Sequence, residues 1–128
     1  MGFFGVLGNS ELSYDSFEKW IDDSLSTELP EEIEAFCFNL YEDGENEWSV
    51  EIVGTNSFDK NDPDRACNEI FDNRDNLLGW ESEDSYEDVL MTVKSLLKSY
   101  LRNGKYQALL KSKKGIGIGF VDGDLELL

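Results

Sequence analysis

Apolar residues recur at every third and fourth position in the stretch "DSYEDVLMTVKSLLKSYLRNG". This spacing predicts an amphipathic helix over residues 85–103, with one apolar stripe packed on the core and a polar face outward. Asp84 with Glu87 resembles a capping box at its start, and Asn103-Gly104 is a stop signal at its end. The stripe consists of Tyr86, Val89, Leu90, Val93, Leu96, Leu97, Tyr100 and Leu101.

Shorter apolar patterns predict three further helices. In "SYDSFEKWIDDSL", the residues Phe17, Trp20 and Ile21 share one helical face. Asp62 followed by Pro63 is a typical cap and first-turn pair, so a helix is expected to begin there. Together with the apolar positions near residue 110, these signals place helices at about 14–25, 63–71 and 105–112.

Alternating apolar and polar positions predict a β-hairpin at about 33–54. Both strands keep their apolar side chains on one face only if Leu40 lies opposite Val50. That register requires a connection with an odd number of residues, three to five of them around Gly44. The apolar positions are Phe36, Phe38 and Leu40 in the first strand and Trp48, Val50 and Ile52 in the second.

Strict alternation of glycine with Ile116, Ile118 and Phe120 predicts a strand near the C-terminus. An Asp122-Gly123 pair suits a two-residue turn with positive φ, which gives a second hairpin at about 115–128. Phe120 would then pair with Leu125 and Ile118 with Leu127, so that all four apolar side chains share one face. A strand face made of glycines also admits the close approach of another backbone.

These elements predict an α+β fold, in which an antiparallel sheet with hairpins at about 33–54 and 115–128 is packed by the four helices. Residues 3–7 and 77–80 are expected to add short strands. A length of 128 residues, with no internal repeat or low-complexity linker, fits a single domain over 1–128.

The glycine and acid patterns fit no common phosphate or calcium motif. The glycines of "KSKKGIGIGF" occur at period two, unlike either a P-loop or the G-x-G-x-x-G turn. Asp122 begins an EF-hand-like spacing of acids, but no Glu stands at the twelfth position to close a calcium site. In an EF-hand beginning at Asp59, Pro63 and Asp64 would replace a ligand and the turn glycine, and Ile70 would replace the last Glu. No metal or cofactor is therefore expected.

The chain contains no histidine, which excludes Ser/His and Cys/His dyads and histidine-ligated zinc. Pairs of carboxylates occur by chance among 28 acidic residues, so they do not indicate an enzyme. The two cysteines, Cys37 and Cys67, fit reduced thiols better than a disulfide framework, with a single bridge as the alternative. Neither a membrane helix nor a secretory signal is expected, which favours a cytoplasmic protein.

Charge is the strongest global feature of the sequence. Asp and Glu number 28 against 11 Lys and Arg, a net charge of −17. Residues 1–90 carry 25 acids and 4 bases, whereas residues 91–114 carry 7 bases and no acid. Such a surface repels nucleic acid and anionic lipid and attracts basic partners, although acidity that serves only solubility is the alternative. The bases Lys94, Lys98 and Arg102 are expected on an exposed helix face or in internal charge pairs.

The whole chain resembles the small acidic immunity proteins of bacterial toxin systems, including those of contact-dependent growth inhibition and related polymorphic toxins. The resemblance lies in the single-domain length and in "NSFDKNDPDRACNEIFD", "YLRNG" and "GIGIGFVDGDLELL". It implies a cytoplasmic protein that is not an enzyme and that binds and neutralises one cognate, basic, nuclease-type toxin. An acidic nucleic-acid mimic or a general protein-binding adaptor is the alternative, and specificity for one partner separates the two.

Two acidic segments are the candidate binding surface for such a partner. One is the tip of the first hairpin, and the other is the segment 59–75, for which a solvated acidic loop is the alternative. Exposed aromatic residues near them would act as anchors, unless they belong to the core. The candidates are Glu42, Asp43, Glu45, Glu47, Asp59, Asp62, Asp64, Glu69, Asp72 and Asp75, with Trp48, Phe58, Phe71 and Trp80 as anchors.

Overall fold

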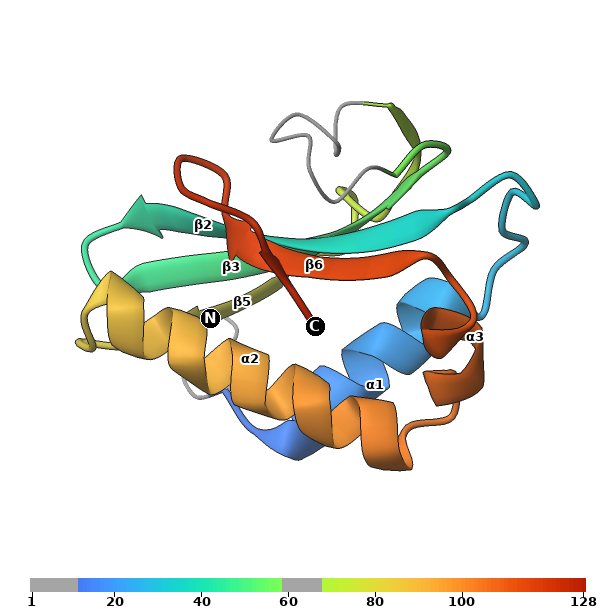
Figure 1. Ribbon diagram of the computed structural model, residues 1–128. Coiled ribbons are helices and arrows are strands. Elements are labelled where there is room, and N and C mark those ends of the chain that lie inside the picture. The colour runs from blue at the N-terminus through green and yellow to red at the C-terminus, as the bar shows by residue number, and fades with distance from the viewer. Residues whose placement is uncertain (1–11, 59–67) are drawn as a thin grey trace.

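A computed structural model describes residues 12–58 and 68–128 of the chain. Its fold is α+β, as predicted: helices α1, α2 and α3 lie on one side of a six-stranded sheet (Figure 1). The strand order is β4-β3-β2-β6-β7, and β5 pairs with β3 beside β4. The other face of the sheet is not covered by a helix within the described residues.

Helix α1 spans Tyr14–Leu25 and helix α2 spans Tyr86–Asn103, close to the predicted bounds. The cap of α2 differs from the prediction. Ser85, not Asp84, is the N-cap, and its side chain accepts a hydrogen bond from the Asp88 amide at 3.2 Å. With Ser85 as the N-cap, the third helical residue is Asp88 and not Glu87, so the predicted pairing of Asp84 with Glu87 is displaced by one residue. Helix α3 is shorter than predicted and spans Gln107–Lys111.

Strands β2 (Ala35–Gly44) and β3 (Glu47–Thr55) form the predicted hairpin. Leu40 pairs with Val50, which confirms the predicted register. The pairing is irregular between Glu42 and Gly44, and Gly44 then pairs with Glu47. Asn46, in the tight turn between the strands, has a φ of 61°, a left-handed conformation that asparagine tolerates better than most residues.

Strand β4 (Glu69–Asp72) contradicts the end of the helix predicted at 63–71. Phe71 pairs with Gly54 and Asp72 with Val53, so this segment extends the sheet along the outer edge of β3. Tertiary pairing with β3 here overrides a local helix signal, and the Asp62-Pro63 start lies outside the described residues. Strand β5 (Leu78–Glu81) confirms the short strand predicted at 77–80, while the strand predicted at 3–7 also lies outside the described part.

Strand β6 (Gly115–Phe120) runs parallel to β2, so the sheet is mixed and not antiparallel throughout. Ala35 pairs with Gly115 and Leu40 with Phe120. The cause is the long connection from β5 through α2 and α3, which returns the chain to the end of the sheet where β2 begins (Figure 1). A helical crossover of this kind is what joins parallel strands, whereas a short turn joins antiparallel ones.

The pairing of β6 with β7 (Glu126–Leu127) is shifted by one residue from the predicted register. Ile118 pairs with Glu126, and the turn closes by a hydrogen bond from the Gly123 amide to the Phe120 carbonyl at 2.9 Å. One residue of shift exchanges the two faces of a strand. The prediction that four apolar side chains share one face is therefore wrong.

Glycines explain why the shifted register is stable. Leu125 lies over the glycine face of β6, where a Cβ atom at Gly117 would come within 2.9 Å of its side chain. The slip also turns Glu126 toward α2, where it forms an ion pair with Lys94 at 2.5 Å. Space on the glycine face and a charge partner on the helix face both favour this register over the predicted one.

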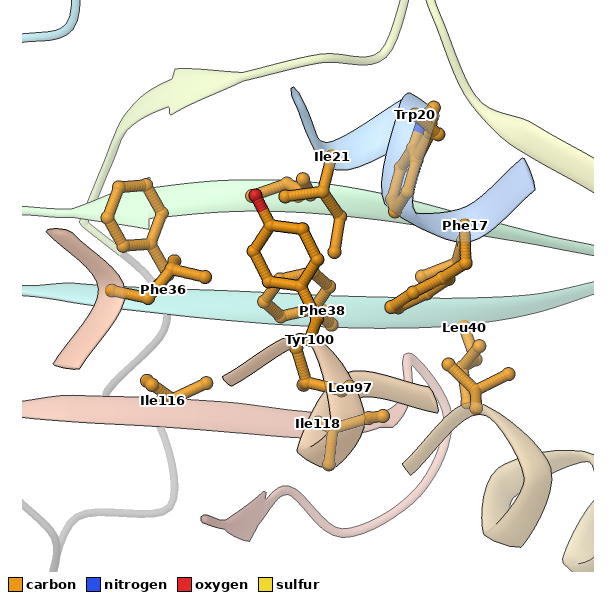
Figure 2. Close-up of a cluster of buried hydrophobic side chains, with 14 of the residues drawn as sticks. Phe17, Trp20, Ile21, Phe36, Phe38, Leu40, Leu97, Tyr100, Ile116 and Ile118 are labelled. Carbon is orange, nitrogen blue, oxygen red and sulfur yellow. The ribbon is translucent and has the colours of Figure 1, made fainter. Parts of the chain in front are cut away.

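The core lies between the helices and the sheet (Figure 2). Phe17 of α1 packs near Phe38 of β2, with ring centroids 6.5 Å apart. Tyr100 of α2 and Ile118 of β6 are fully buried in the same cluster. Burial of each such side chain contributes about 1.5–3 kcal/mol, so this layer holds the helices on the sheet and fixes which surfaces remain exposed.

Candidate partner-binding surface

The tip of the β2–β3 hairpin lies beside the segment that connects β5 to α2. Glu47 pairs with Glu81 across the β3–β5 ladder. The Ser82 amide donates a hydrogen bond to the Asn46 carbonyl at 2.9 Å, and the Trp48 indole N–H donates one to the Ser82 carbonyl at 3.0 Å. Two acidic segments that are about forty residues apart in the sequence therefore share one surface.

The turn between β6 and β7 reaches the same end of the molecule. Phe120 stacks edge-on against Trp48 and against Tyr86, with ring centroids 5.9 Å apart in both pairs. The Val121 amide donates a hydrogen bond to the Leu40 carbonyl at 3.1 Å. Figure 1 shows the hairpin tip, the start of α2 and this turn gathered at one end of the sheet.

These three segments define what we call the acidic end. It carries eleven exposed carboxylates, and its segments 40–48, 78–93 and 120–125 contain no lysine or arginine. Within the described residues, no ion pair involves any of the eleven. The carboxylates belong to Glu42, Asp43, Glu45, Glu47, Glu81, Glu83, Asp84, Glu87, Asp88, Asp122 and Asp124.

Basic residues gather at the other end of the molecule. They lie along the second half of α2, around α3 and at the start of β6 (Figure 1). Lys94 is paired with Glu126, and Lys114 is paired with Glu34 at 3.1 Å. Lys98 and Arg102 are exposed, so of the three bases predicted on α2 one forms an internal charge pair and two lie on a solvent-exposed face.

A second acidic surface is a groove of about 400 Å³ between the end of α1 and the residues that follow β4. Asp72, Asp75 and half-buried Phe71 line it together with Asp23 and other residues. Two of these carboxylates already have cationic partners: Asp23 pairs with Lys19 at 2.8 Å, and Asp72 with an arginine at 3.5 Å. This groove is therefore less available to a basic ligand than the acidic end.

That arginine is Arg74, which organises a polar network on the helix-free face of the sheet. It binds Glu51 at 2.9 Å and Glu69 at 2.7 Å. Glu51 is only 1% exposed and also accepts hydrogen bonds from Tyr41 at 2.5 Å and Asn39 at 3.1 Å. A buried carboxylate without such partners would be strongly destabilising, so the network anchors the β4 region to β3.

The pKa values of this network follow its geometry. Burial, and then the hydrogen bond to Glu51, raise the pKa of Tyr41 to about 12. The hydrogen bond to Glu69 is the largest of the effects that raise the pKa of Arg74 above its usual range. Both groups therefore stay protonated at neutral pH. The network stabilises the structure and does not act as an acid-base pair.

The predicted site residues differ in where they lie in the structure and in how exposed they are. The four acids of the hairpin tip are exposed and lie together, whereas Glu69, Asp72 and Asp75 lie elsewhere, and Asp59, Asp62 and Asp64 fall outside the described residues. Among the proposed anchors, Trp48 and Trp80 are core residues with exposures of 4% and 6%. Phe58 is half-buried against Gly115, where a side chain on the glycine would collide with its ring.

Sequence reasoning missed the acids that complete the acidic end. Glu81, Glu83, Asp84, Glu87 and Asp88 lie within nine residues, in "WESEDSYED", and this density was a usable signal. Their proximity to the hairpin tip depends on the pairing of β5 with β3, which the sequence does not specify. An exposed aromatic residue, Tyr86 at 59%, and an exposed Met91 at 68% accompany them.

Comparison of the chain with protein-family models, curated proteins and solved structures found no match. The described residues include no cluster of side chains suited to hold a metal ion. In the same residues, no helix combines the length and the apolarity needed to cross a membrane.

Proposed function

We propose that the protein is a cytoplasmic immunity protein that binds and neutralises a cognate basic toxin of nuclease type. The observation that supports this proposal is the acidic end, where eleven exposed carboxylates have no cationic partner in the described part of the chain. Unpaired charges of one sign at one end favour a partner of opposite sign and accelerate its association.

The mechanism would be occupation of the toxin's own nucleic-acid site. A nuclease holds phosphate groups with arginine and lysine side chains, and carboxylates on a protein surface can occupy the same positions. The acidic end combines such carboxylates with exposed apolar area at Tyr86 and Met91. Apolar anchors inside a charged rim are the usual anatomy of a tight protein interface. No catalytic step by this chain is required.

A growth assay tests the proposal. The C-terminal region of the protein encoded immediately upstream is induced in a test bacterium, with and without this chain. We expect induction to stop growth and co-expression of this chain to restore it. If the upstream region is harmless, or is toxic and not neutralised, the proposal fails.

Matched variants test whether charge at the acidic end is responsible. Glu83→Gln with Glu87→Gln removes two exposed carboxylates from the acidic end, and Glu31→Gln with Glu32→Gln removes two exposed carboxylates outside it. We expect only the first pair to weaken toxin binding, by about 3- to 30-fold if each charge contributes ~0.3–1 kcal/mol. Binding of many unrelated basic proteins, all displaced by salt, would instead favour a nucleic-acid mimic.

A further inference from the structure

A hollow at the acidic end has the features of a pocket for one cationic side chain. It has a volume of about 260 Å³ and lies between the end of β5 and the first turns of α2. Trp80, Val89 and Leu12 contribute apolar surface to it, and Glu81 and Asp84 contribute carboxylates. Trp80 and Val89 are themselves 6% and 2% exposed, so the core supports these walls.

We propose that this hollow binds a lysine or arginine side chain presented by the protein partner. These side chains have an apolar stem and a charged head, and they are stable where the stem lies on apolar surface and the head meets carboxylates. The hollow offers both. This inference takes one point from the proposed function, namely which protein supplies the side chain. The site itself is argued from the hollow alone.

The charge balance at the hollow favours a cation in spite of the nearby helix start. The N-terminus of α2 carries a partial positive charge of about half a unit. Asp84, Glu87 and Asp88 add three full negative charges around that terminus, and Glu81 adds a fourth beside the hollow. The carboxylates therefore dominate the local potential.

The groove beside Phe71 is a weaker candidate for the same ligand. It is larger, but Asp23 and Asp72 on its walls already pair with Lys19 and Arg74. A cation entering it would have to compete with these internal partners. Glu81 and Asp84, in contrast, make no ion pair within the described residues, so their charges are available to a ligand.

The test is an NMR titration of the whole ¹⁵N-labelled chain at low ionic strength. The probes are three blocked tripeptides, Gly-X-Gly, in which X is arginine, lysine or citrulline. Citrulline has nearly the shape of arginine but no charge. We expect the two cationic probes to shift the backbone amides of residues 80–84 and 89–92 and the indole signal of Trp80, and we expect no saturable shift with citrulline.

Two double variants locate the binding. Glu81→Gln with Asp84→Asn should weaken binding of the arginine probe about 3- to 30-fold, because it removes two partly exposed charge interactions. Asp72→Asn with Asp75→Asn, the matched control at the groove, should leave it unchanged. Shifts centred on residues 23–28 and 71–76, equal shifts with citrulline, or no localised shifts would each overturn the proposal.

This titration is independent of the growth assay. If the hollow binds the probes but the toxin is not neutralised, the immunity proposal fails and the site remains. If neutralisation succeeds but the probes do not bind at the hollow, the toxin contacts another part of the surface and the inferred site is wrong. The two proposals can therefore fail separately.

Discussion

Tyr100 connects all three helices through a single side chain. It is fully buried, yet its hydroxyl donates a hydrogen bond to Asp22 of α1 at 2.6 Å and accepts one from the Tyr106 amide, just before α3, at 3.1 Å. Gly104 lies directly against its ring, where a larger residue would collide. Burial, and then the bond to Asp22, raise the pKa of Tyr100 above its ordinary value.

The raised tyrosine pKa values predict alkaline destabilisation. In the unfolded chain a tyrosine loses its proton near pH 10, whereas folded Tyr41 holds its proton up to about pH 12 and Tyr100 is shifted in the same direction. The folded state therefore binds more protons in this window. We expect the contribution of these two tyrosines to the free energy of unfolding to be constant below pH 9 and to fall as the pH rises from 10 toward 12, by roughly 1–2 kcal/mol per tyrosine.

Urea unfolding at a series of pH values measures this fall. Tyr41→Phe should reduce its steepness, because the variant lacks one of the two shifted groups. If the pH dependence of the free energy of unfolding is unchanged in Tyr41→Phe, the pKa of Tyr41 is not raised by its burial and its bond to Glu51. Tyr100→Phe should also lower stability at neutral pH by about 1–3 kcal/mol, since it leaves the partly buried Tyr106 amide and the Asp22 carboxylate without this partner.

At the scale of elements, the glycines of strand β6 determine what packs on one of its faces. They leave one face of the strand without side chains, and Phe58, Leu125 and the backbone around Asp124 occupy that space. A Cβ atom at Gly119 would collide with the carbonyl oxygen of Asp124, while one at Gly123 would meet nothing closer than 3.8 Å. The glycines therefore serve packing and not ligand binding.

Gly119→Ala should destabilise the protein by about 1–3 kcal/mol, because backbone cannot move aside as a flexible side chain can. Gly117→Ala should be milder, since the atoms nearest to its added Cβ belong to the flexible side chain of Leu125. Gly123→Ala is the control and should change stability by less than about 0.5 kcal/mol. Equal losses in all three, measured by urea unfolding, would show that collision on the glycine face is not the cause, since the smaller backbone freedom of alanine in the unfolded chain would by itself raise stability.

At the scale of the whole molecule, charge is segregated between two ends. Within the part of the chain that the structure describes, the acidic end has eleven carboxylates that form no ion pair, and the region from Lys94 to Lys114 has seven bases. Like charges at one end repel each other, and salt screens that repulsion. A surface of this kind is stable only because the core beneath it supplies enough apolar burial.

Added salt is therefore expected to stabilise the free protein. Between 10 and 300 mM NaCl we expect the free energy of unfolding to rise by on the order of 1 kcal/mol, the scale of one close pair of charges in water. The Glu83→Gln, Glu87→Gln variant should show a smaller rise than the Glu31→Gln, Glu32→Gln variant. The same salt dependence in both would indicate that repulsion is spread over the whole surface.

Local patterns predicted most of the fold correctly. The periodicity of α1 and α2 and the register of Leu40 with Val50 follow from which side chains must share one face, and the short strand predicted at 77–80 corresponds to β5. The prediction was wrong where long-range pairing decides. Residues 69–71 form a strand because β3 offers them an edge, and β6 is parallel because α2 and α3 carry the chain back across the sheet.

The same division holds for the candidate site. The sequence by itself determined that the protein is acidic, that seven of its eleven bases lie in residues 91–114, that histidine chemistry is absent and that the hairpin tip is charged. Only the tertiary structure decided that the tip, the start of α2 and the β6–β7 turn meet, and that Trp48 and Trp80 support this surface from inside. Composition and periodicity are local properties of the chain, whereas a surface is made by pairings between distant segments.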